Sequence, residues 1–391
     1  MDRFRLLQEE YDRVIAFRHD LHMHPELSGE EYRTSEKIRE FLSQLPGCRI
    51  LDLPVKTGVA AQIPADEPKG EIMLRADIDA LPQTEMTQIP WQSQNPGVMH
   101  ACGHDVHTSA LAGAAMVLCR KKQKGELKAT IDLVFQPAEE GTTGARMLID
   151  AGLFDVIHPG VCFGMHNWPS VQTGRVVCRE GALMAAKRNF DVKIFGEGGH
   201  GSMPHLNTDP IVCAAAVVQS LQTVVSRNVN PLESAVLSIN MISGGTVVNR
   251  VADEVLIKGT IRSLSDAVLD RAVDRVKAIV GSTAAAYECR SEIIWRERIP
   301  AVWNSPQMTA AAIRCAGETG SVITNAPPSL ASEDFSLYRE YAPSFFFWTG
   351  SHTPGQEVTE LHKPQFFADD DVLRYASELY ASCASYYEQE E

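Results

Sequence analysis

The sequence predicts an α/β protein in which a mixed, mostly parallel sheet is covered by helices and a smaller α+β domain is inserted. Strand-like apolar runs alternate with helical patterns in the first third of the chain and again after about residue 300. This alternation is typical of a parallel sheet with helices on both faces. Residues 184–298 instead follow the order β-α-β-β-α-β of a ferredoxin-like sandwich. We therefore expect one domain from 1–183 with 299–391 and an inserted domain from 184–298.

The elements of the larger domain follow from hydrophobic periodicity. Helices are expected over roughly 2–23, 30–44, 106–120, 306–318 and 370–388, and strands over 71–75, 130–135 and 161–165. Ligands of such sheets bind beyond the carboxyl ends of the strands. The loops that follow these strands are therefore the first place to look for chemistry.

The inserted domain is marked most clearly at its first helix. Asp209 can cap this helix and Pro210 suits its first turn. An apolar stripe expected to face the core consists of Ile211, Ala214, Ala215, Val218, Leu221 and Val225. The remaining elements are expected to be strands over 187–195, 235–243, 254–263 and 290–298 and a helix over 266–287.

Composition excludes several classes of partner and location. The formal net charge of -14, without a basic cluster, argues against nucleic acid and anionic membranes as partners. The N-terminus lacks the apolar core of a signal peptide, and the uncharged stretch 210–226 is too short to span a bilayer. The nine cysteines form no CxxC pair, which is typical of a reduced protein. We therefore expect a cytoplasmic protein without a transmembrane segment.

Five segments place metal-binding or acid/base side chains where loops are expected. They are 75–82 (RADIDALP), 99–107 (MHACGHDVH), 136–141 (QPAEEG), 164–169 (GMHNWP) and 360–364 (ELHKP). In the second segment, Cys102 and His104 offer a thiolate and an imidazole, which suit Zn, Mn, Fe, Co or Ni better than Mg or Ca. A lone Cys-x-His pair is more often a coincidence. Three histidines and one cysteine within eight residues favour a metal site.

The adjacent carboxylates Glu139 and Glu140 follow an apolar strand and a proline. They would repel each other unless a cation neutralised them. One of them can then bind metal while the other accepts a proton from water. Standing alone, the pair would be an ordinary acidic surface pair.

Three further kinds of side chain bear on this site. His166 and His362 each stand at the end of an ordered element and are followed by a proline, although singly each is more often an ordinary histidine. Asp77 and Asp79 alternate along an extended segment and point to opposite faces unless the chain turns. One of them could orient a ligand histidine.

Together these segments resemble the M20 metallopeptidase family, specifically its branch of N-acyl-L-amino acid amidohydrolases, hippurate hydrolases and indole-3-acetyl-amino-acid hydrolases. The resemblance runs from 18–27 (RHDLHMHPEL) to the His362 segment and so covers nearly the whole chain. Residues 198–205, 244–249 and 259–262 resemble the lid of the family. The resemblance implies a zinc-peptidase-like catalytic domain and an inserted lid through which the protein forms a homodimer.

Carried over by position, the resemblance implies two divalent metal ions per subunit, bridged by Cys102. The implied remaining ligands are His104, Glu140, His166 and His362, the implied catalytic residues are Glu139, Asp79 and His200, and the weaker substrate-binding matches are Asn249 and Arg262. Many relatives use a bridging aspartate instead of Cys102, so the cysteine favours the amidohydrolase branch. Mn or Zn is the expected metal, with Co or Ni as further options.

The implied reaction is metal-dependent hydrolysis of the amide bond of N-acyl amino acids. Glu139 would act as general base, His200 would help to hold the carbonyl oxygen, and a carboxylic acid and a free amino acid would form. The alternative of a dipeptidase or carboxypeptidase keeps the same site. A non-catalytic binder conflicts with the complete set of ligands and base. A cysteine hydrolase using Cys102 with His104 or His107 would survive metal removal.

Overall fold

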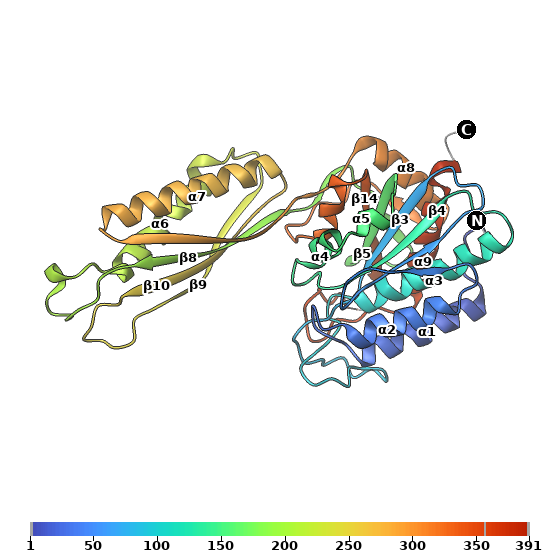
Figure 1. Cartoon of the computed structure of the whole chain (residues 1–391), viewed down its shortest axis with the longest axis horizontal. Coiled ribbons are helices and arrows are strands. Elements are labelled where there is room, and N and C mark those ends of the chain that lie inside the picture. The colour runs from blue at the N-terminus through green and yellow to red at the C-terminus, as the bar shows by residue number, and fades with distance from the viewer. Residues whose placement is uncertain (1–2, 356, 389–391) are drawn as a thin grey trace. The chain divides into compact units, whose positions relative to one another are not determined.

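The computed structural model describes residues 3–355 and 357–388, which form two compact units (Figure 1). Unit 1 comprises Met1–Gly181, Trp303–Pro327 and Asp334–Glu391, and unit 2 comprises Ala182–Val302 and Pro328–Glu333. The short second piece of unit 2 differs from the predicted division. It joins unit 2 through backbone hydrogen bonds, from Ser329 N to Leu183 O and from Ala185 N to Ala331 O.

The sheet of unit 1 is mixed and mostly parallel, as predicted. Its strand order is β1-β2-β4-β3-β5-β14-β6-β13. The strands are β1 (Arg49–Leu51), β2 (Val59–Ile63), β3 (Glu71–Asp77), β4 (Thr130–Gln136), β5 (Val161–Gln172), β6 (Arg175–Val177), β13 (Ser321–Ile323) and β14 (Ser344–His352). The central strands β4, β3, β5 and β14 pair in parallel, whereas β1 and β2 run antiparallel at one edge.

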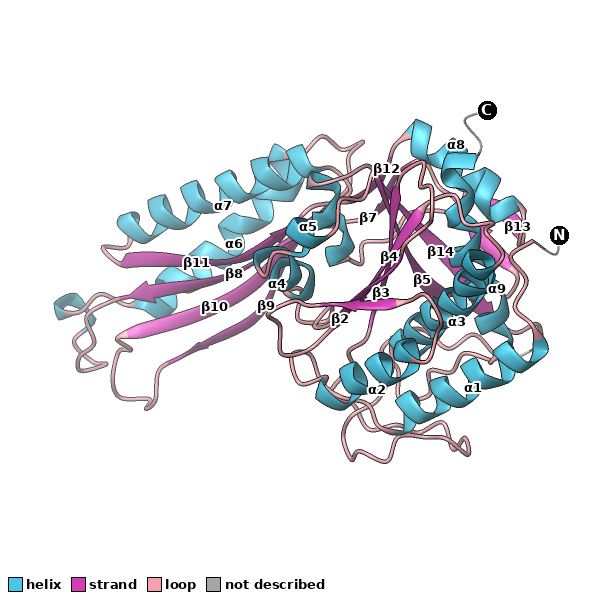
Figure 2. Ribbon diagram, turned by 45° about the vertical axis from the view of Figure 1, so that its right-hand side comes forward, coloured by secondary structure: helices cyan, strands magenta, loops and turns pink. Residues whose placement is uncertain are grey.

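Helices cover this sheet (Figure 2). They are α1 (Gln8–Met23), α2 (Tyr32–Ser43), α3 (His104–Gln123), α4 (Gly144–Asp150), α5 (Leu153–Val156), α8 (Pro306–Gly317) and α9 (Asp371–Ser382), with 3-10 turns η2 (Asp334–Glu340) and η3 (Cys383–Glu388). The central helix α3 packs against α1 and α9 and is buried over most of its length. It begins just after Gly103, whose φ of +88° is left-handed, and a Cβ there would lie 2.2 Å from Asn167 Oδ1. Glycine therefore allows the chain to turn directly into α3 at His104.

Unit 2 has the predicted β-α-β-β-α-β order. Its elements are β8 (Ala186–Phe195), η1 (Pro204–Leu206), α6 (Pro210–Asn228), β9 (Ala235–Gly244), β10 (Glu254–Ser263), α7 (Asp266–Ala286) and β11 (Arg290–Ile299). The antiparallel sheet has the order β11-β8-β10-β9, and α6 and α7 lie side by side against it (Figure 1). The short strands β7 (Gly181–Met184) and β12 (Val302–Asn304) pair where the chain passes between the units.

Helix α6 is capped as predicted, but its buried face coincides only in part with the predicted stripe. The Asp209 side chain accepts hydrogen bonds from the first turn. The buried residues are Pro210, Cys213, Ala214, Val217, Leu221 and Val224. The predicted stripe is thus wrong at Ile211 and Ala215, which are exposed, because the helix is apolar on two faces and periodicity does not say which face is covered. By length and composition alone α6 could cross a membrane, but its buried face forms part of the core of unit 2.

Candidate metal centre

The candidate ligands come from four places in unit 1. Cys102 and His104 lie at the start of α3, Glu140 follows β4, His166 lies on β5, and His362 follows β14. Parallel strands β4, β3 and β5 bring these segments together. The cluster therefore lies where open α/β sheets usually bind ligands.

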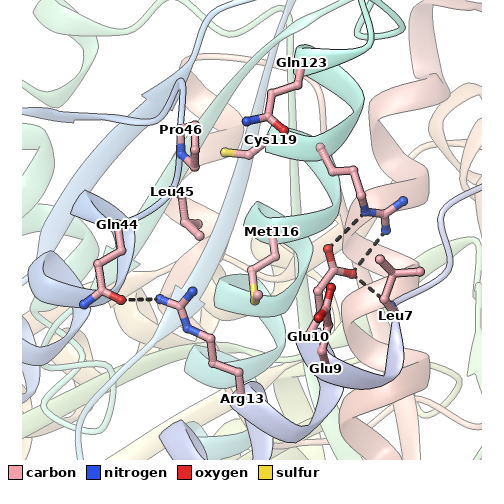
Figure 3. A pocket seen from close by; sticks show the side chains of 11 residues that line it. Leu7, Glu9, Glu10, Arg13, Gln44, Leu45, Pro46, Met116, Cys119 and Gln123 are labelled. Carbon is pink, nitrogen blue, oxygen red and sulfur yellow. Dashed lines mark hydrogen bonds and ion pairs between the residues drawn. The ribbon is translucent and has the colours of Figure 1, made fainter.

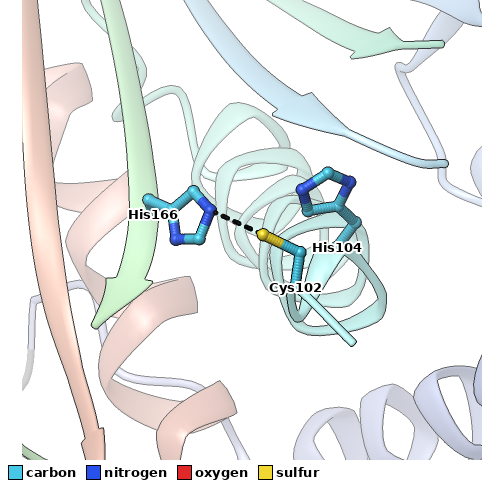
Figure 4. Close-up of side chains that lie close together, drawn as sticks. All are labelled: Cys102, His104 and His166. Atoms are coloured by element: carbon cyan, nitrogen blue, oxygen red, sulfur yellow. Dashed lines mark hydrogen bonds between the residues drawn. The ribbon is translucent and has the colours of Figure 1, made fainter. Parts of the chain in front are cut away.

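The first group consists of Cys102, His104 and His166, whose potential ligand atoms lie within 4.8 Å of one another. Figure 4 shows the Cys102 thiol and the His166 ring facing each other, with Sγ 3.3 Å from Nε2. All three side chains are buried. Burial and the nearby Glu140 carboxylate raise the pKa of the Cys102 thiol well above its usual value. A cation bound beside the sulfur would oppose this effect.

The second group consists of Cys102, Glu140 and His362. The Nε2 atom of His362 lies 3.3 Å from Cys102 Sγ and 3.3 Å from Glu140 Oε1. His362 has a left-handed backbone, with φ of 62°. Cys102 is the one residue that the two groups have in common.

Unsatisfied buried atoms test whether metal ions fit. Within the described residues, His104 Nε2 and Glu140 Oε1 are buried and have no hydrogen-bond partner. Buried polar atoms in native proteins nearly always have a partner, and a metal ion can take that place. The donors are sulfur, imidazole nitrogen and carboxylate oxygen, a set suited to borderline transition-metal ions. The residues therefore fit two divalent metal ions.

Asp79 contacts one residue of each ligand group. Its Oδ1 lies 3.1 Å from His104 Nδ1, and its Oδ2 accepts a hydrogen bond of 3.0 Å from the Glu140 backbone N–H. Burial would raise the pKa of Asp79, but the hydrogen bond and charge of His104 hold it below its usual value. A proton on His104 Nδ1 donated to this carboxylate leaves Nε2 available for a cation.

Asp77 and His107 form a second support that the sequence analysis did not assign. Asp77 Oδ1 lies 2.6 Å from His107 Nδ1, and His107 Nε2 accepts a hydrogen bond of 2.8 Å from the backbone N–H of Asn167. This contact fixes the strand next to His166. Asp77 and Asp79 thus both contact histidines of α3, instead of pointing to opposite faces of the sheet. The available signal was the spacing of His107 three residues after His104.

Glu139 lies beside the candidate ligands in a strained turn. A carboxylate oxygen of Glu139 lies within 4.8 Å of ligand atoms of His104 and Glu140. Ala138 and Thr142, which flank the glutamate pair, have φ of 52° and 54°. Such backbone conformations cost non-glycine residues roughly 1–3 kcal/mol and are concentrated at functional sites. The strain supports a functional role for this turn.

The other three predicted site residues lie in unit 2. His200 is exposed, and its Nδ1 lies 2.8 Å from Ser202 Oγ. The exposed Asn249 accepts a backbone hydrogen bond of 2.9 Å from Gly201, so these two loops are neighbours. Arg262 lies near the far end of β10 from Asn249 and donates a hydrogen bond of 2.8 Å to Leu330 O. Unit 2 therefore brings His200 and Asn249 together but not Arg262.

A separate hollow of unit 1 has a volume of about 420 Å³ (Figure 3). Its lining comes from the start of α1, the residues just after α2 and the second half of α3. Arg13 donates to Gln44 across 2.7 Å, and Arg120 pairs with Glu10 at 3.0 Å. None of the candidate ligands lines it.

Comparison with known proteins identifies the family. The model of peptidase family M20/M25/M40 matches residues 73–386. The chain is 40% identical over 375 residues to N-acetylcysteine deacetylase of Bacillus subtilis (strain 168), covering 96% of each chain. It is 34% identical over 383 residues to thermostable carboxypeptidase 2 of Saccharolobus solfataricus (strain ATCC 35092 / DSM 1617 / JCM 11322 / P2), covering 97% of this chain and 96% of the relative.

A solved structure from Bacillus subtilis, described as a dinuclear metal binding peptidase from the M20 family, aligns with a TM-score of 0.82 and 36% identity, covering 97% of this chain and 98% of that one. The family resemblance and the fold class inferred from the sequence are thereby confirmed. The chain belongs to peptidase family M20/M25/M40.

Proposed function

We propose that the chain hydrolyses the amide bond of N-acyl amino acids with acetyl, benzoyl or other small acyl groups. The observation that carries the proposal is a pair of candidate ligand groups that share Cys102 and lie next to Glu139. A relative named for deacetylating N-acetylcysteine supports the substrate class. The products are a carboxylic acid and a free amino acid.

The proposed roles divide among the residues of the cluster. Cys102 with His104 and His166, and Cys102 with Glu140 and His362, would hold two ions, which supply Lewis acidity toward the amide carbonyl and the attacking water. Glu139 accepts a proton from this water and passes it to the leaving nitrogen. Asp79 keeps His104 and Glu140 in place. Mn or Zn is the proposed metal, with Co or Ni as further options.

The residues of unit 2 are proposed to act on the substrate. His200 stabilises the negative charge that develops on the carbonyl oxygen, as hydrogen-bond donors in an oxyanion hole do. Asn249 and Arg262 are each proposed to bind the substrate. They lie toward opposite ends of β10, so one subunit cannot apply both to the same carboxylate, and the planar guanidinium of Arg262 is the better suited of the two. The free state of all nine cysteines supports a cytoplasmic location.

Metal removal should abolish activity on a panel of N-acetyl, N-benzoyl and N-indoleacetyl amino acids, because the reaction depends on bound metal. Stripped enzyme is reconstituted with Mn, Zn, Co or Ni, and released amino acid is measured. We expect Mn or Zn to restore hydrolysis. Full activity after chelation would contradict the proposal and favour a cysteine hydrolase instead.

The second candidate is a dipeptidase or carboxypeptidase, which the carboxypeptidase relative favours. Dipeptides and C-terminally extended peptides in the same panel distinguish the two functions. A kcat/KM for peptides above that for every N-acyl amino acid would replace the first proposal with the second.

We also propose that unit 2 forms a homodimer. Strand β9 is at an edge of its sheet, and an exposed sheet edge is a template for pairing with another chain. We define the lid patch as the exposed apolar side chains of α6, the helix-covered face of β9 and the loop after β9, namely Ile211, Val212, Ile242, Val247 and Val248. Apolar residues gathered in this way mark interaction surfaces.

Replacing Ile242 by Glu should convert the dimer to a monomer, because a charge would be buried in the interface. Sedimentation velocity of the wild type and the variant measures the change. Leu232→Glu is the matched control, since Leu232 is 94% exposed in unit 2 and lies outside the lid patch. A wild type that is monomeric and fully active would overturn the dimer.

A further inference from the structure

Glu31 is a buried acid outside the candidate ligand set. It directly precedes α2 and is 0% exposed. Its Oε1 accepts hydrogen bonds of 2.8 Å from the backbone N–H groups of Gly29 and Ala138. Its Oε2 is buried without a hydrogen-bond partner among the described residues. Burial of a carboxylate with so few partners is unfavourable, and it raises the pKa of Glu31.

The Ala138 contact reaches the strained turn of the candidate site. Ala138 directly precedes Glu139 and has a φ of 52°, a conformation that residues other than glycine rarely adopt. In this conformation its N–H points to the Glu31 carboxylate at 2.8 Å. The hydrogen bond therefore offsets part of the strain and favours this shape of the turn.

Pro137, which directly precedes Ala138 in the turn, is also closely packed. A Cβ at Gly58 would lie 2.7 Å from Pro137 Cδ. The Gly58 N–H donates to Ser35 Oγ at 2.7 Å, and Ser35 Oγ donates to the Glu31 backbone oxygen at 2.6 Å. The backbone of Glu31 is thus tied to the residue that packs against Pro137.

Ser28 reaches the end of the glutamate pair. Its hydroxyl donates to Asp79 Oδ2 at 2.6 Å, and the same oxygen accepts the Glu140 N–H at 3.0 Å. Residues 28–31 thus engage the backbone on both sides of Glu139, directly through Glu31 and through Asp79.

We propose that residues 28–31 are a positioning clamp, in which Glu31 holds the backbone of Ala138 so that Glu139 and Glu140 keep their separate orientations. Glu31 is a positioning residue because, among the described residues, its carboxylate hydrogen-bonds to backbone N–H groups and to none of the candidate ligand side chains. The predicted effect on kcat rests on the proposed hydrolytic function. The predicted ordering of the turn at Ala138 does not depend on that function.

The test compares Glu31→Ala, Glu31→Gln and Glu26→Ala in the full-length enzyme. Glu31→Ala should lower kcat by roughly 10–100-fold with little change in KM, because small misplacements of catalytic groups have effects of this size. Glu31→Gln keeps an oxygen acceptor for the two N–H groups and should retain most of the activity. Glu26 is the matched control, since its carboxylate accepts the N–H groups of Arg33 and Thr34 at 3.1 and 2.7 Å and does not contact the turn.

Hydrogen exchange provides a measurement that is independent of activity. The amide of Thr142 donates to Glu139 O at 2.6 Å, and that of Gly144 donates to Ala138 O at 3.1 Å. Both amides should exchange faster in Glu31→Ala than in Glu26→Ala, even if the two variants lose similar thermal stability. Metal content should stay at the wild-type value in Glu31→Gln and Glu26→Ala, and kcat of all three variants is measured at saturating metal, because a looser turn also weakens metal binding by Glu140.

Three outcomes would overturn the clamp: equal kcat losses in Glu31→Ala and Glu26→Ala, a Glu31→Gln variant as impaired as Glu31→Ala, or unchanged exchange at Thr142 and Gly144. An inactive wild type would refute the proposed function. In that case the exchange comparison alone decides the clamp.

Discussion

Glu139→Gln should keep its metal ions and lose turnover by the ~10²–10⁴-fold typical of a missing general base. Glu139 belongs to neither of the two ligand groups that share Cys102, although its carboxylate lies within 4.8 Å of ligand atoms of His104 and Glu140. Glutamine preserves the size of the side chain but cannot accept the proton. Added metal should therefore not restore activity, which steady-state kinetics on metal-saturated enzyme would measure.

Glu140→Gln is the matched comparison, because the residues are adjacent and chemically identical. Glu140 Oε1 lies 3.3 Å from His362 Nε2 and has no hydrogen-bond partner in the described part of the chain. Loss of this anionic ligand should lower metal content together with activity, and excess metal should partly restore both. Metal analysis of the purified variants distinguishes them. Metal loss in Glu139→Gln with retention in Glu140→Gln would reverse the assigned roles, and full activity in either would refute the mechanism.

The sequence was sufficient to single out the parts of the candidate site that lie in short segments. Cys102 and His104 are two residues apart, and Glu139 and Glu140 are adjacent, so local spacing already suggested their chemistry. Strands that alternate with helices predicted the parallel sheet that brings such segments together. The family resemblance was needed for the distant His362, because no local pattern links it to Cys102.

Long-range packing determines several features that the sequence analysis did not predict. The run 344–352 (SFFFWTGSH) forms the central strand β14, which the sequence analysis did not predict, although continuous apolar runs are typical of buried parallel strands. Glu31 looks like an ordinary acid before a helix, and only the fold brings it to Ala138. On α6, apolar residues occur on two faces. Val217 is buried and Ile211 is exposed because only one of these faces packs against the rest of unit 2.

Cys102→Ser should weaken metal binding at both positions, because both ligand groups contain this one sulfur. A serine hydroxyl remains neutral where a thiolate can carry the charge that two cations share. Loss of outer supporting contacts alone lowers metal affinity ~10–100-fold, so loss of a shared ligand should lower it by at least as much. Metal content after dialysis and hydrolysis rates at saturating metal measure the effect. Cys162→Ser is the control, since Cys162 is also buried, on β5, and belongs to neither ligand group. Its metal content should match the wild type even if its thermal stability falls. Wild-type metal stoichiometry and activity in Cys102→Ser would show that the sulfur does not bridge the ions.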